Sequence, residues 1–255
     1  MNGALVTFKK ELFSYCLNPV GWIIAVIFYL WRGFEMYALA YQFAAYRADV
    51  ELLAPQSYGL PSTFLMVMLV PGVLTMRCFA EERRTGSLET LMTAPVRDGA
   101  IVFGKWAAAV AFFALLWLPS IAILHLLEYS PFLDTDISFG PVFAAYLGMF
   151  LLSGFLLAFG CFASSLTDNV LLAAMLTIIF CYGLLQFPQR LRLLAGGDRA
   201  EPLVRELLDK CSVMTNFSEW FARGLIDTSQ VVFYLGGIGC FLFLATVSLS
   251  SRRVA

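Results

Sequence analysis

The sequence predicts an all-α integral membrane protein that crosses the bilayer six times. Of its 255 residues, 60% are hydrophobic and only 14% are charged, whereas soluble domains average about 45–50% apolar and about 25% charged residues. The mean hydropathy is +0.79. Apolar segments long enough to span a bilayer as helices recur along the chain. The predicted spans are residues 20–41, 62–78, 100–127, 141–163, 170–187 and 229–249.

Composition also limits the function of the chain, and residues 1–255 are expected to form one transmembrane domain. The net charge of −1 argues against a nucleic-acid partner. The six cysteines are scattered and form no CxxC pair, so a disulfide framework is not expected. His125 is the only histidine, so no metal site is expected either. Because no catalytic constellation is visible, we do not expect an enzyme.

Residues 3–17 predict an amphipathic helix that lies in the plane of the membrane interface. Its apolar side carries Leu5, Phe8, Leu12 and Tyr15. Lys9 and Lys10 lie elsewhere on its surface, and Asn18-Pro19 ends it.

Two charged residues lie within the first predicted span. Arg32 and Glu35 are spaced to pair on one face of the helix. Charged side chains inside a membrane usually face a bundle interior or a water-filled pathway. Alternatively, the helix reaches the membrane interface here, and both side chains extend into the headgroup region. The sequence leaves these two interpretations open.

The densest charge in the chain runs from the end of the second span into the connection to the third span. This charged cluster consists of Arg77, Glu81, Glu82, Arg83 and Arg84. It must lie in water or against a protein partner, because the bilayer interior would hold it only at high energetic cost. Arg77 and Glu81 are spaced to pair on one helix face. Gly86 can end this helix, since glycine adopts the left-handed conformation without steric cost.

A second, shorter amphipathic helix is predicted directly after Gly86. Its first residue is a serine that can cap it, followed by a glutamate that the helix dipole favours. Two leucines and a methionine then share one face, and Pro95 ends the helix. The residues of interest are Ser87, Leu88, Glu89, Leu91 and Met92. Two turns are too few for a stable isolated helix, so it docks on the lipid surface or in a socket on a soluble partner.

The later spans carry fewer signals. The fourth span contains small residues, Gly148 among them, that permit close helix approach in membranes. Residues 164–169 predict a short polar turn, and residues 188–228 form the longest polar region. Within that region, an apolar face typical of a helix at the membrane edge ends at Gly224. This face consists of Phe217, Trp220 and Phe221.

The string from Gly99 to Lys105 matches the first seven positions of a phosphate-binding P-loop. No strand precedes it, Trp106 replaces the Ser or Thr that would contact Mg²⁺, and the string opens an apolar helix. We therefore interpret the match as coincidence. No ATP or other cofactor is expected to bind this chain.

An even number of spans places both ends of the chain on one side of the membrane. The short connections on that side carry more Lys and Arg than Asp and Glu. Because short basic loops stay in the cytoplasm, both termini and the charged cluster are expected to be cytoplasmic.

The stretch F-A-E-E-R-R-T-G-S-L-E-T-L-M-T-A-P-V at residues 79–96 resembles the signature of ABC type-2 transporter permeases. Within these, the chain is similar to the gliding-motility (GldF-like) branch. Further matching stretches are N-P-V-G at 18–21, P-G-V-L-T-M-R at 71–77, S-S-L-T-D-N at 164–169 and N-F-S-E-W-F-A-R-G-L-I-D at 216–227.

This resemblance implies a permease dimer, with an identical or related second chain, in the bacterial inner membrane. Two separate cytoplasmic ATPases would bind the ATP and Mg²⁺. The resemblance also implies that residues 4–16 form the interface helix and that residues 87–94 form the coupling helix that contacts the ATPase. Thr167, Asp168 and Asn169 would form a second cytoplasmic contact. The function implied is that of an exporter permease; the alternative is a membrane assembly or anchoring subunit whose ATPase drives a conformational signal.

Overall fold

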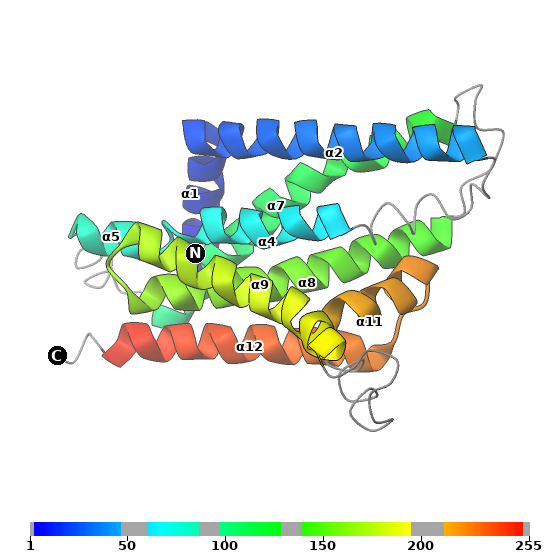
Figure 1. Cartoon of the computed structure of the whole chain (residues 1–255). Coiled ribbons are helices and arrows are strands. Elements are labelled where there is room, and N and C mark those ends of the chain that lie inside the picture. The colour runs from blue at the N-terminus through cyan, green and yellow to red at the C-terminus, as the bar shows by residue number, and fades with distance from the viewer. Residues whose placement is uncertain (1–2, 47–60, 87–96, 129–138, 195–211, 252–255) are drawn as a thin grey trace.

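The computed structural model describes residues 3–46, 61–86, 97–128, 139–194 and 212–251, and these residues are almost wholly helical (Figure 1). No strand occurs within these ranges. The helices are α1 (Gly3–Leu17), α2 (Pro19–Tyr46), α4 (Pro61–Thr75), α5 (Ala80–Arg84), α7 (Asp98–Glu128), α8 (Phe139–Leu166), α9 (Val170–Leu194), α11 (Val213–Glu219), the 3₁₀ turn η3 (Phe221–Arg223) and α12 (Thr228–Ser251).

The prediction of six spans is confirmed, because six of the described helical segments are long and apolar enough to cross a membrane. The second span runs from α4 through a short turn into α5. The fifth span predicted at residues 170–187 agrees with the membrane-spanning segment of α9, Val170–Pro188. The helix α9 continues through Pro188 to Leu194, since a proline removes one helical hydrogen bond without necessarily ending the helix.

The long helices run along one bundle, and α1 crosses that bundle at one end (Figure 1). The helix α5 and the last turn of α12 lie at the same end, here called the α5 end. Both termini of the described chain are therefore at one end of the bundle, as an even number of spans requires.

Helix α8 lies at the centre of the bundle and packs against α4, α7, α9 and α12. In the membrane-spanning part of α8, 67% of the residues are buried, against 17% in that of α12. A small residue also permits close packing of α8 on α11 and η3, as predicted: Gly148 lies against the rings of Phe217 and Phe221. Both rings are fully buried, so the apolar face expected at the membrane edge packs into the protein instead, and only Trp220 of that face is exposed.

Helix α1 has the bounds that the sequence predicts, but its faces differ in part. Phe8, Leu12 and Tyr15 are half-buried, whereas Leu5 is 50% exposed. The inner face also holds Glu11, because this carboxylate has a buried partner on α7. The sequence pattern puts Leu5 on the same side as Phe8, Leu12 and Tyr15, but in the structure it lies on an outer face with Phe13, Leu17 and Lys9.

Candidate functional site

At the α5 end, helix α1 lies directly on helix α7. Gly104 makes this possible: a Cβ atom at this position would lie 2.8 Å from the carbonyl oxygen of Ala4 and 2.9 Å from Cβ of Thr7. Only a residue without a side chain permits the two backbones to approach so closely. The next residue of α7, Lys105, is thereby brought under α1.

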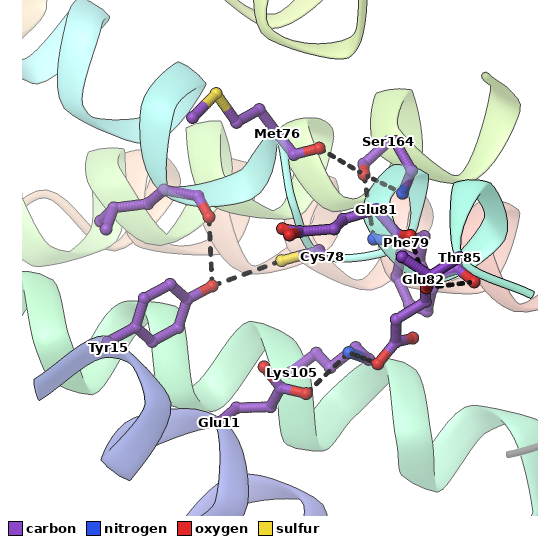
Figure 2. Close-up of polar contacts among 12 residues, drawn as sticks. Glu11, Tyr15, Met76, Cys78, Phe79, Glu81, Glu82, Thr85, Lys105 and Ser164 are labelled. Carbon is purple, nitrogen blue, oxygen red and sulfur yellow. Dashed lines mark hydrogen bonds and ion pairs between the residues drawn. The ribbon is translucent and has the colours of Figure 1, made fainter. Parts of the chain in front are cut away.

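Lys105 joins three helices. Its side chain is 2% exposed, and Nζ donates hydrogen bonds of 2.8 Å to Oε1 of Glu11 on α1 and of 2.8 Å to Oε1 of Glu82 on α5 (Figure 2). The ammonium also lies 5.4 Å from the centre of the Phe79 ring. Taking an ammonium out of water is costly, and two carboxylates at hydrogen-bonding distance offset that cost. We call Glu11, Lys105 and Glu82 the charge triad.

Tyr15 links α1 to the second span beside the charge triad. Its hydroxyl donates to the carbonyl oxygen of Leu74 at 3.1 Å and lies 3.5 Å from Sγ of Cys78 (Figure 2). Burial, and next the neighbouring Cys78, raises the pKa of Tyr15 well above its ordinary value. The phenol therefore stays protonated and remains a hydrogen-bond donor.

Ser164, near the end of α8, holds the start of α5. Its Oγ accepts hydrogen bonds of 3.1 Å from the backbone N–H of Phe79 and of 3.1 Å from that of Ala80 (Figure 2). The first N–H groups of a helix have no partner within the helix, and a hydroxyl oxygen satisfies them as a cap does. In α5 this oxygen comes from another helix, so the cap also fixes α5 on α8.

The predicted charged cluster forms α5 and the turn before it. Arg77 and Glu81 pair as expected, with 3.5 Å between Nε and Oε2. Arg83 reaches Asp168 in the turn between α8 and α9, with 3.3 Å between Nη1 and Oδ1, and Arg84 is exposed. The structure thus brings together two regions that sequence reasoning treated separately, the charged cluster and the second cytoplasmic contact.

The turn at residues 167–169 is short, as predicted. Thr167 accepts a hydrogen bond from the backbone N–H of Asn169 through its hydroxyl, at 3.1 Å. Asn169 accepts one from the N–H of Leu171 through Oδ1, at 3.0 Å. The second bond begins α9, so the turn presents Asp168 beside α5 in a defined position.

Gly86 follows α5 with a φ of 71°, and its N–H donates to the carbonyl oxygen of Arg83 at 3.0 Å. This left-handed conformation confirms the predicted end of the helix. The predicted coupling-helix residues lie outside the described part of the chain: they are Ser87, Leu88, Glu89, Leu91 and Met92. The described chain continues at position 97, just before α7.

Arg32 and Glu35 lie apart from the charge triad. Arg32 is roughly 20 Å along α2 from Pro19 at 1.5 Å per residue. Nη1 of Arg32 lies 3.0 Å from Oε2 of Glu35, and both bond to the hydroxyl of Thr63 on α4. The two side chains are 3% and 5% exposed, so they face the bundle interior rather than an exposed interface. That they line a pathway stays a prediction.

Sequence reasoning missed four residues of the site: Glu11, Tyr15, Lys105 and Ser164. One signal was available, because a single lysine inside an apolar span is rare and needs a buried partner. The others gave none, since their partners are far away in the sequence. Together with Arg83 and Asp168, these residues tie α1, the second span with α5, α7 and the α8–α9 turn into one unit, here called the junction.

Comparison with protein families gives a match to the model described as ABC-2 family transporter protein, over residues 50–190. This range covers more than half of the 255 residues and contains Lys105, α5 and the α8–α9 turn. A comparison with curated proteins gives no match. From the family match and the six membrane-spanning helices, we conclude that the chain belongs to the ABC-2 family of transporter proteins, as a membrane component and not as a catalytic subunit.

Proposed function

We propose that this chain is the permease subunit of an ATP-driven exporter, and that a separate cytoplasmic ATPase hydrolyses the ATP. The resemblance of residues 79–96 and the family match support this proposal. The same resemblance suggests the gliding-motility branch of these permeases, the bacterial inner membrane as the location, and a second permease chain as dimer partner.

The observation that carries the proposal is the position of the junction relative to residues 87–96. This segment follows α5 and precedes α7, and the charge triad joins these two helices through Lys105. A force applied to the segment would therefore reach the second and third spans at once. Glu11 extends the same connection to α1.

In the proposed mechanism, the α5 end faces the cytoplasm and the segment at 87–96 docks in a groove on the ATPase. ATP binding closes the two ATPases of the complex, and the docked segments move with them. Arg83 and Asp168 keep α5 and the α8–α9 turn together during this motion. The junction then converts a movement at the surface into a tilt of the spans.

Leu88 and Leu91 are the proposed anchors of the docked segment, because they form the apolar side of the predicted helix. Burying one such side chain is worth roughly 1.5–3 kcal/mol. Replacing both with Asp removes that gain and places charge in an apolar groove. The expected loss of affinity is about a hundredfold or more, since about 1.4 kcal/mol corresponds to a factor of ten.

The test is co-purification of the ATPase with the Leu88→Asp/Leu91→Asp variant from mild detergent. The matched control is Thr90→Asp/Thr93→Asp, which adds the same charge to the opposite side of the predicted helix. We expect the leucine variant to lose its ATPase and the threonine variant to keep it, while both insert into the membrane. If the leucine variant kept its ATPase at normal stoichiometry, the segment would not be the coupling element.

A further inference from the structure

A cavity of about 330 Å³ opens beside the junction, between α1, the start of α2, α4 and α5. This volume is in the range of small-molecule sites, which run from about 300 to 1,000 Å³. The cavity is lined by residues of α1 and α5, and these two helices lie at the α5 end of the bundle. Its contents would therefore lie at the level of the membrane surface.

One wall of the cavity is a row of hydrogen-bond donors on α1 and the bend after it. Lys10, Ser14 and Asn18 recur at every fourth position, so they lie above one another on one side of the helix. Arg77 of the second span also borders the cavity. Within the described chain, the ammonium of Lys10 and the hydroxyl of Ser14 have no hydrogen-bond or ion-pair partner. Ammonium, guanidinium, hydroxyl and amide donors together suit a phosphate group.

Another part of the lining is apolar. It consists of Val20 and Ile24 on α2 and Val73 on α4. A ligand that matches both parts has a phosphate at one end and a hydrocarbon chain at the other. Membrane phospholipids have this structure, and they surround the chain.

The charges around the cavity also select the type of headgroup. Three cations border it, together with three carboxylates, so the formal charges cancel. They are Lys10, Arg77, Lys105, Glu11, Glu81 and Glu82. A lining without net charge gives no advantage to a lipid with a net negative charge. Glu81, which is 41% exposed beside Arg77, favours an ammonium group next to the phosphate.

We propose that this cavity binds a zwitterionic phospholipid, with the phosphate against Lys10 and Arg77 and one acyl chain along Val20, Ile24 and Val73. The bound lipid would lie between α1 and the second span, beside Tyr15 and the charge triad. This inference does not depend on the proposed coupling to an ATPase.

The test is native mass spectrometry of the full chain in mild detergent with added lipids. The probes are phosphatidylethanolamine, phosphatidylglycerol and a phosphate-free glucosyl diacylglycerol, all with the same acyl chains. We expect phosphatidylethanolamine to be retained in preference to both others. Lys10→Gln should weaken its binding roughly tenfold, because it removes a charged donor from the phosphate.

Two variants make the result specific. Lys9→Gln is the matched control, because Lys9 is also an exposed lysine of α1 but does not line the cavity. Ser14→Trp fills the cavity from an exposed position, so it should exclude the lipid without unfolding the chain, which its elution profile would verify.

Three results would overturn the proposal. One is equal retention of phosphatidylglycerol or of the glycolipid. Another is an equal loss of binding in Lys9→Gln and Lys10→Gln, or full binding in Ser14→Trp. The third is displacement of the lipid by millimolar soluble phosphoethanolamine, which would mean that the cavity binds a free phosphate compound rather than a membrane lipid.

Discussion

Replacing Lys105 with methionine is expected to separate α1 and α5 from α7. Methionine is also an unbranched side chain, but it removes the charge that holds two carboxylates. The Oε1 atoms of Glu11 and Glu82 both lie 2.8 Å from Nζ, and both side chains are only 16% exposed. The variant therefore leaves two negative charges close together where little water reaches them.

The expected cost follows from the burial of the lysine. Removing one partner of a buried ion pair costs about 3–5 kcal/mol, because the remaining charge loses its compensation. A loss of about 4 kcal/mol corresponds to a decrease in melting temperature of roughly 8–16 °C for a chain of this size. Hydrogen exchange should rise in the backbone amides of α1 and α5, which the triad holds, and less in α8.

The matched control is a triple variant that adds Glu11→Gln and Glu82→Gln to Lys105→Met. Neutral amides need no counter-charge, so this variant should recover most of the lost stability, as happens when a whole buried ion pair is replaced. Melting in detergent and hydrogen exchange measure both variants. A single variant that melts within about 2 °C of the wild type, or a triple variant no more stable than the single one, would refute the reasoning.

Three further predictions concern the other contacts. Ser164→Ala should destabilise the chain by about 1–3 kcal/mol, because it leaves two buried N–H groups without an acceptor, and hydrogen exchange at the start of α5 measures it. Asp168→Arg should weaken ATPase binding, because it places a like charge beside Arg83. The exchanged pair Arg83→Asp/Asp168→Arg should restore part of the ATPase binding. An equal loss of ATPase binding in both variants would exclude a role for the ion pair. Replacing Arg32 and Glu35 together with Leu should abolish transport while leaving membrane insertion intact, since a buried pair is often replaced by apolar residues without loss of stability; unchanged transport would make the pair structural.

The fold could be predicted from the sequence because its signals are local. Each span is a long, predominantly apolar segment, and Arg77 and Glu81 are one helical turn apart, so their pairing follows from spacing alone. The end of α5 could likewise be predicted, because Gly86 is a residue type that adopts the left-handed conformation found there. The outer and inner faces of α1 could not be assigned fully, because the position of Glu11 depends on a lysine on another helix.

The site could be predicted only in part because its contacts are distant in the sequence. Glu11 and Lys105 are separated by 94 positions, and Ser164 by 85 from Phe79. The P-loop-like string drew attention to Lys105 for a reason unrelated to its contacts. The contacts of Lys105 depend on how the helices pack, so they could not be predicted from the sequence. Arg83 and Asp168, in contrast, both lie in stretches that carry the family resemblance.

We infer that ATP is hydrolysed on a separate subunit, which this chain controls through residues 87–96 and the junction. The most direct measurement is ATP hydrolysis by the purified chain alone, by the ATPase that co-purifies with it from native membranes, and by the two reconstituted together. We expect no saturable hydrolysis by the chain alone, and a change in the rate of the ATPase when the wild-type chain, but not Leu88→Asp/Leu91→Asp, is added. Saturable hydrolysis by the chain alone, or an ATPase rate that responds equally to both chains, would contradict this inference.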